Sequence, residues 1–262
     1  LVWDKTLPFP LNNTWGYHDA ATGNGRWDLY YKEMIKIFGE PESMENFCDK
    51  MQLMNAEGYK GIFEAAGHKL NDIGGVMLWK LNAAFPSLVW QVYDWFLMPN
   101  AGYYSMQNAC EPVHIQMNPV DNKVMVLNRT AKPAAGLTAQ ADIYDSASLR
   151  IDQLREKVSA GPSETKELMS LDSALREAKG VSFVVLNLRN SAGSVISRNV
   201  YWISPDRDFR SLGDLPSAGL SVAVVSENKL NADKQWEFSI INNSDKIAFF
   251  IRPQLMSGNE EI

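Results

Sequence analysis

The period of the hydrophobic pattern changes near Pro112. Before this residue apolar side chains recur three and four positions apart, and after it short segments alternate between apolar and polar positions. The alternating segments are separated by Asn, Asp, Gly and Pro, and they occupy residues 113–116, 123–127, 137–144, 181–188 and 195–203. Short strands repeated in this way are typical of a β-sandwich of immunoglobulin size. We therefore expect an α/β region followed by all-β domains.

Two helices are expected before the change of period. Apolar positions follow helical spacing over residues 27–38, and Gly39 with Pro41 supplies the end of this helix. A second helical stripe covers residues 43–66. Residues 1–26 are rich in turn-forming and aromatic residues, and we expect a structured loop there without a regular element.

An apolar run at residues 74–82 predicts a buried strand. The run begins with two glycines and is too short for an ordinary helix. A helix followed by such a strand is typical of α/β architecture. The segment 148–179 can be read at either period, and we assign it to strands.

A second β-region is expected beyond residue 206. A polar linker precedes three more strand patterns, at residues 220–225, 236–241 and 247–255. Three strands do not close a sandwich. We therefore expect a second β-domain whose remaining strands are missing from this chain.

Charge and hydropathy exclude two classes of partner. The 262 residues include 25 Lys and Arg against 31 Asp and Glu, a formal net charge of −6, with no basic run. A surface that neutralises phosphates is not expected, so nucleic acid is excluded as a partner. Lys80 and Arg252 interrupt the two most apolar segments, and we predict no membrane span.

The sequence predicts no metal and no cofactor. Two cysteines, Cys48 and Cys110, cannot supply a disulfide framework or a four-cysteine zinc site, and we expect two free thiols. His68 and His114 have no partners at the spacing of metal ligands.

The densest group of candidate binding residues follows residue 78. Trp79 lies near the C-terminal end of the predicted strand, where barrel enzymes place their sites. The flat apolar face of a Trp packs on the C–H face of a pyranose ring, and Asn82, Gln91 and Asp94 offer polar groups that orient hydroxyls. Spacing alone leaves open the alternative that Trp79 and Trp90 are core residues.

Several motifs around this group resemble one known family. The motifs are Trp79-x-Leu81-Asn82, Ser87-Leu88-x-Trp90-Gln91-x-x-Asp94, Ala101-Gly102-Tyr103-Tyr104 and Glu111-Pro112-Val113-His114-Ile115-Gln116. Upstream and downstream matches are Phe38-Gly39-x-Pro41, Gln52-Leu53-Met54-Asn55-x-Glu57 and Ser197-Arg198-Asn199-Val200-Tyr201-Trp202. In order and spacing they resemble glycoside hydrolase family 2, in the branch of exo-β-D-glucosaminidases and plant-type endo-β-mannosidases.

The resemblance implies a multidomain α/β plus all-β fold. Residues 1–111 would be the C-terminal portion of a (β/α)8 TIM barrel. Residues 112–204 would form an immunoglobulin-like β-sandwich, and residues 205–262 the start of a second, incomplete one. A whole barrel needs about 250 residues, so the sequence is expected to match an internal piece of a larger enzyme.

The resemblance also implies a retaining exo-β-glycosidase that hydrolyses terminal β-linked glucosamine or mannose. Its two carboxylates, about 5 to 5.5 Å apart, are expected upstream of residue 1, so no catalytic residue is predicted in this chain. The predicted substrate-binding residues are His18, Trp79, Asn82, Trp90 and Asp94. For His18 an ordinary surface position is equally consistent with the sequence.

The implied partners are a β-linked oligosaccharide and the upstream half of the barrel, and the implied location is secreted or periplasmic. A non-catalytic carbohydrate-binding or scaffold module is the alternative, favoured by the missing carboxylates and the Trp-rich segment. Among the acidic residues that are present, Glu57 and Glu64 share a helix face and are expected to be solvated or to pack. Glu111 is expected to make a structural pair.

Overall fold

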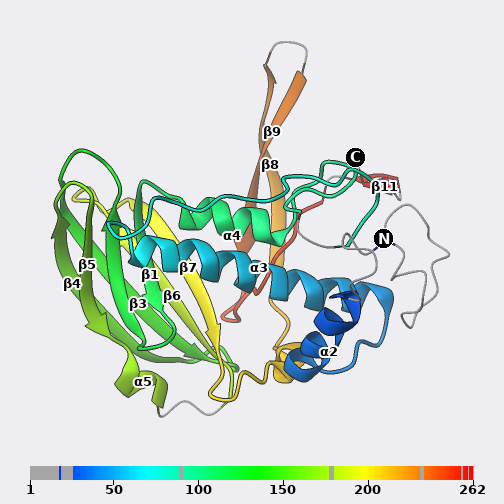
Figure 1. The fold of residues 1–262 in the computed structure, drawn as a ribbon, viewed down its shortest axis with the longest axis horizontal. Coiled ribbons are helices and arrows are strands. Elements are labelled where there is room, and N and C mark those ends of the chain that lie inside the picture. The colour runs from blue at the N-terminus through cyan, green and yellow to red at the C-terminus, as the bar shows by residue number, and fades with distance from the viewer. Residues whose placement is uncertain are drawn as a thin grey trace.

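The computed structural model describes residue 18 and residues 26–88, 91–176, 180–230, 233–254, 256–258 and 260–261. Figure 1 shows a β-sandwich, the helices α3 (Met44–His68) and α4 (Ala101–Ala109) running side by side toward it, and a long hairpin that projects away from both. Strand is the main regular structure of the described residues, and helices are few. No described helix is long and apolar enough to cross a membrane.

The helices before the sandwich are α2 (Arg26–Phe38) and α3 (Met44–His68), which confirms both sequence predictions. The side chain of Ser43 caps α3 by accepting a hydrogen bond from Asn46 N at 3.1 Å. Gly39 follows α2 with φ of +77°, a conformation that glycine adopts without strain. A third helix, α4 (Ala101–Ala109), was not predicted, and Asn100 caps it through Tyr103 N.

The sandwich has two antiparallel sheets, as predicted. One sheet has the order β1-β2-β5, with β1 (Val113–Asn118), β2 (Lys123–Asn128) and β5 (Glu164–Ser170). The other has the order β4-β3-β6-β7, with β3 (Ala134–Asp145), β4 (Arg150–Ala160), β6 (Ser182–Arg189) and β7 (Val195–Ile203). The ambiguous segment 148–179 supplies β4 and β5 as predicted, but it also contains the short helix α5 (Asp172–Arg176).

The core of the sandwich lies between these two sheets. Alternate residues of β6, namely Val184, Leu186 and Leu188, are fully buried against Ile115 and Val126 of the facing sheet. Phe183 is also fully buried but belongs to a second hydrophobic cluster. Because successive side chains of a strand point to opposite faces, β6 contributes to both cores at once.

The second core joins the helices to the sandwich. Met34 and Phe38 of α2 and Phe47 of α3 pack in it with Phe183 and Phe209. The rings of Phe38 and Phe209 are stacked with centroids 5.7 Å apart. The 3₁₀ helix η1 (Arg210–Asp214) follows directly and leads the chain away from the sandwich.

The last strands form a separate hairpin. Strands β8 (Leu220–Leu230) and β9 (Asp233–Asn242) pair only with each other among the described residues, and Figure 1 shows them standing away from the sandwich. The short strands β10 (Met256–Ser257) and β11 (Glu260–Glu261) pair near the end of the chain. The prediction of strands over 220–225 and 236–241 is confirmed.

The prediction of a third strand at 247–255 is wrong for its described residues, 247–254, which are irregular. Ile247 and Phe249 of this segment pack on the second core, whereas Phe250 and Ile251 are exposed. Phe249 contacts the rings of Phe183 and Trp202, with centroids 5.2 Å away in each case.

The predicted buried strand at 74–82 is also wrong. The segment is irregular apart from an isolated bridge between Asn82 and Tyr93, and Met77 is 96% exposed. A buried parallel strand needs neighbours on both edges and layers on both faces. Among the described residues only the end of this segment pairs, at Leu81 and Asn82, and the side chains of Met77, Trp79 and Leu81 are exposed. The described residues therefore show the sandwich part of the expected fold, and no barrel strands are seen among them.

Candidate functional site

Three of the predicted sugar-binding residues, Trp79, Asn82 and Asp94, lie on the irregular segment between α3 and α4. Trp79 is 81% exposed, which excludes a core position for it in this structure. Trp90 lies outside the described residues. Asn82 bridges to Tyr93, next to Asp94, so the segment brings these polar positions close together.

Asp94 orders the turn that follows it. Its Oδ1 accepts hydrogen bonds from Phe96 N at 2.8 Å and from Met98 N at 2.9 Å. Leu97 within this turn has φ of +62°, an unusual conformation for a branched apolar residue. Asp94 Oδ1 is therefore engaged in the turn.

His18 contacts the same segment. Its Nδ1 lies 2.9 Å from the carbonyl oxygen of Pro86, and its own carbonyl accepts from Leu88 N at 3.0 Å. The structure thus brings His18 beside the segment that carries Trp79 and Asp94, although 61 residues separate His18 from Trp79 in the numbering.

Helices α3 and α4 position this segment. The backbone N–H of Ala101 donates to Gln52 Oε1 at 2.8 Å, and that of Gly102 donates to Asn55 Oδ1 at 2.6 Å. These bonds join two of the quoted sequence motifs and satisfy donors of the first turn of α4. Tyr103 of α4 then contacts Tyr93, with ring centroids 5.0 Å apart.

The predicted residues are not enclosed. Two hollows in the described part of the chain, of about 430 and 390 Å³, lie elsewhere: the first between the end of α3 and the β4–β5 turn, the second beside α5. Sugar sites usually bury most of their ligand. Trp79 and Asn82 are exposed and Asp94 is partly exposed, so these residues are not enclosed in a pocket in this structure.

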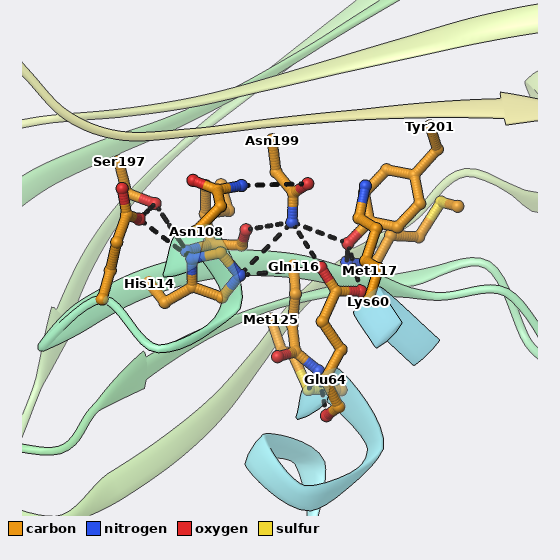
Figure 2. Close-up of polar contacts among 12 residues, drawn as sticks. Lys60, Glu64, Asn108, His114, Gln116, Met117, Met125, Ser197, Asn199 and Tyr201 are labelled. Carbon is orange, nitrogen blue, oxygen red and sulfur yellow. Dashed lines mark hydrogen bonds and ion pairs between the residues drawn. The ribbon is translucent and has the colours of Figure 1, made fainter. Parts of the chain in front are cut away.

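A buried polar cluster holds α3 against the sandwich (Figure 2). Glu64, which is 5% exposed, accepts hydrogen bonds from Asn199 Nδ2 at 2.6 Å and from the Tyr201 hydroxyl at 2.8 Å. Gln116 Nε2 donates to the backbone oxygen of Glu64 at 2.9 Å. Of the two alternatives expected for Glu64, solvation or packing, the structure shows packing, because the strands of the sandwich supply donors that replace water.

His114 lies in the same cluster and is fully buried. Its Nδ1 is 3.0 Å from Glu111 Oε2, and its Nε2 is 3.7 Å from Glu64 Oε1. Glu111 also accepts from the Ser197 hydroxyl. The structural pairing predicted for Glu111 is confirmed. Burial by itself lowers the pKa of His114, but hydrogen bonds and charge from Glu111 and Glu64 raise it above its ordinary value.

Lys60 completes the cluster from one turn earlier on α3. Its ammonium donates to the backbone oxygen of Val200 and lies 3.7 Å from the centroid of the Tyr201 ring, a cation–π contact. Burial lowers the pKa of Lys60 to about 8, against the opposing charges of Glu64 and Glu57. Burial also raises the pKa of Tyr201 well above its ordinary value, as does the neighbouring charge of Glu64.

Both halves of this cluster belong to sequence motifs named above, but a contact between the two motifs was not predicted. Residues 111–116 and 197–202 are about 85 positions apart, yet His114, Asn199 and Tyr201 meet at Glu64. The available signal was the polar side chain in an otherwise buried strand pattern. Within the described residues no three His, Cys, Asp or Glu side chains are placed to hold a metal ion.

The sandwich matches a known domain family, and most of the chain is similar to known enzymes. Residues 121–208 match the family described as the Mannosidase Ig/CBM-like domain. An exo-β-D-glucosaminidase of Arthroderma benhamiae is 27% identical over 253 residues, which cover 88% of this chain and 29% of the relative. A mannosylglycoprotein endo-β-mannosidase of Lilium longiflorum is 29% identical over 228 residues, covering 85% of this chain and 23% of the relative.

A solved structure shares the fold. The exo-chitosanase CsxA of Amycolatopsis orientalis, in complex with PNP-β-D-glucosamine, superimposes with a TM-score of 0.81 at 24% identity over 87% of this chain and 30% of that one. The resemblance predicted from the motifs is therefore confirmed. Residues 121–208 thus match the Mannosidase Ig/CBM-like domain family, and the chain is similar to part of an exo-β-D-glucosaminidase and of an endo-β-mannosidase. It spans less than a third of the length of these two relatives.

Proposed function

We propose that this chain is part of a retaining exo-β-glycosidase that hydrolyses terminal β-linked glucosamine or mannose. The observation that carries the proposal is the similarity to an exo-β-D-glucosaminidase, which extends over 88% of the chain. In this proposal double displacement is performed by two carboxylates upstream of residue 1. The chain by itself is then inactive.

The proposed division assigns residues 1–111 to the C-terminal part of a TIM barrel. Residues 112–204 are the immunoglobulin-like sandwich, and 205–262 begin a second sandwich. The exposure of Met77 and Trp79 supports this division, because a segment that completes a barrel leaves its apolar side chains in water when its neighbours are absent. The upstream barrel half is the partner that would cover them.

Trp79 is the proposed platform for the sugar ring. Its exposed face offers apolar area for the C–H face of a pyranose, and Asn82, Asp94 and His18 offer polar groups nearby. Trp90 is proposed as a second aromatic contact on the ground of the motif. By the same resemblance the enzyme is proposed to be secreted or periplasmic.

The test uses an extended protein in which this chain follows the residues encoded upstream of it. Hydrolysis of PNP-β-D-glucosaminide and PNP-β-D-mannoside is measured for the wild type, for Trp79→Ala and for Trp95→Ala. We expect a drop in kcat/KM of at least about tenfold for Trp79→Ala, the loss of one stacking contact of about 1.4 kcal/mol. Trp95, 46% exposed on the same segment, is the matched control.

Loss of activity in both Trp variants to the same extent would contradict the assignment of Trp79 as the sugar platform. If the extended wild-type protein hydrolyses neither glycoside, the proposed reaction is contradicted.

A non-catalytic carbohydrate-binding module is the second candidate. It is favoured by the family description of residues 121–208 as Ig/CBM-like and by the exposed Trp79. Calorimetric titration of the isolated chain with chitosan and β-mannan oligosaccharides tests it. Binding that is lost in Trp79→Ala and kept in Trp95→Ala would support the module, and no binding by the wild type would reject it.

A further inference from the structure

The fully buried imidazole of His114 lies between carboxylates of two different parts of the chain. Glu111 directly precedes the sandwich, and its Oε2 is 3.0 Å from Nδ1. Glu64 belongs to α3, and its Oε1 is 3.7 Å from Nε2. His114 itself lies on β1, where it pairs with Leu127 of β2. The imidazole is therefore placed at the junction of α3 and the sandwich.

The charged and titratable groups around His114 come from every element packed against it. Helix α3 contributes Lys60, Glu64 and His68, and β7 contributes Tyr201. Cys110 and Glu111 precede β1, and Arg129, which follows β2, donates through Nη1 to the Glu111 backbone oxygen at 2.8 Å. The carboxylates of Glu111 and Glu64 both lie beside the imidazole, whereas the Lys60 ammonium lies over the ring of Tyr201.

Two hydrogen-bond arrangements fit these positions. Asn199 Nδ2 lies 3.3 Å from His114 Nε2, so a neutral imidazole that donates from Nδ1 to Glu111 accepts at Nε2 from this amide. A doubly protonated imidazole has no acceptor atom and must donate from Nε2. The carboxylate oxygen beside Nε2 is Glu64 Oε1, at an ion-pair distance of 3.7 Å, and this oxygen also accepts a hydrogen bond from the Asn199 amide.

We propose that protonation of His114 strengthens the attachment of α3 to the sandwich. In the protonated state the imidazolium bridges Glu111 and Glu64 and fixes the end of α3 on β1. In the neutral state Nε2 accepts from Asn199, and only the hydrogen bonds of Asn199, Tyr201 and Gln116 hold Glu64.

The direction of the pH dependence follows from His114. Its pKa in the folded chain is raised above the ordinary value of 6.5. The stabilisation is therefore fully present below about pH 6.5 and is lost as the pH rises through the folded-state pKa. A lower pH strengthens the attachment of α3.

The experiment begins with the wild-type 262-residue chain, observed by NMR of the imidazole carbons from pH 5 to 9. The chain has three histidines, so the variants His18→Gln and His68→Gln assign the signals. The His114 signal is expected to titrate above pH 6.5 and to move toward lower pH in Glu64→Gln. A His114 that titrates below 6.5, or stays neutral throughout, would overturn the proposal.

Urea unfolding at pH 5.5 and 8.5 gives the second readout. Each unit by which the His114 pKa is raised makes the unfolding equilibrium about tenfold less favourable at low pH, and this pH effect should disappear in His114→Gln. His68→Gln is the control, since His68 contacts Met125 Sδ rather than a carboxylate. If His114→Gln does not fold, the wild-type titration with its Glu64→Gln shift decides. An equal effect of pH on the stability of His114→Gln and of the wild type would overturn the proposal.

Discussion

The hydroxyl of Tyr201 on β7 donates to Glu64 Oε2 on α3 at 2.8 Å, across 137 residues of sequence. The same oxygen of Tyr201 accepts from Met117 N at 2.8 Å. One side chain therefore connects both sheets of the sandwich with the helix that precedes them. This contact fixes where the helical region sits on the sandwich.

Tyr201→Phe should destabilise the chain by about 1–3 kcal/mol. The variant removes the donor to Glu64 and leaves the buried N–H of Met117 without its acceptor. Urea unfolding measures the free-energy change. Tyr104→Phe, at a position that is 56% exposed, is the control and should change it by less than about 0.5 kcal/mol. Equal effects of the two variants would show that the Tyr201 contacts contribute nothing.

Gly102→Ala should separate α4 from α3. A Cβ at this position would overlap Asn55 Oδ1 and Tyr59 Cδ2 of α3, so the helices must move apart. We expect a loss of at least about 1–3 kcal/mol in stability, the usual cost of overpacking. Gly58→Ala in α3 is the matched control, because its Cβ meets nothing within 4 Å and alanine favours helix by about 1 kcal/mol. A stabilised Gly102→Ala chain would contradict the close approach.

Lys60 should give the stability a second pH dependence, separate from that of His114. Its folded-state pKa of about 8 lies below the ordinary 10.5, so between these values the unfolded chain binds more protons. Stability from this group therefore rises with pH between about 8 and 10.5. In Lys60→Met this rise should disappear, as measured by urea unfolding at pH 8 and 10. An unchanged rise would place the Lys60 ammonium in water.

The β8–β9 hairpin should make the isolated chain self-associate. Val222 and Val224 pair with Ile240 and Phe238 on one face, and all four side chains are between 39% and 65% exposed. An uncovered apolar strand pair is a template for association. Light scattering should show larger species for the wild type than for Val222→Lys. Ala223→Lys, which points to the opposite face, is the control, and a monomeric wild type would contradict the prediction.

Several strands of the sandwich could be predicted from short segments in which apolar and polar residues alternate between turn residues. Strand β7 (Val195–Ile203) alternates in this way, and its predicted bounds agree with the structure. Helix α4 was missed because its nine residues include Gly, Ser and Asn and show no strong apolar stripe. Its formation depends on Asn100 and on the acceptors Gln52 and Asn55 of α3, which are distant in sequence.

The segment 74–82 was predicted as a strand because its residues are apolar, but an apolar pattern does not show which neighbours exist. Trp79 and Asp94 could be singled out as candidate binding residues because they lie in the local motifs that also carry the family resemblance. The cluster around Glu64 could not be assembled from sequence, since its partners His114, Asn199 and Tyr201 meet only when the sandwich closes.

The central claim is that this chain completes a β-glycosidase whose carboxylates lie upstream of it. Turnover of PNP-β-D-glucosaminide should be measured for the 262-residue chain and for the extended protein at equal concentrations. The account predicts hydrolysis by the extended protein only, with PNP-β-D-mannoside as the second substrate to be compared. Turnover by the isolated chain after rigorous purification, or none of either substrate by the extended protein, would contradict it.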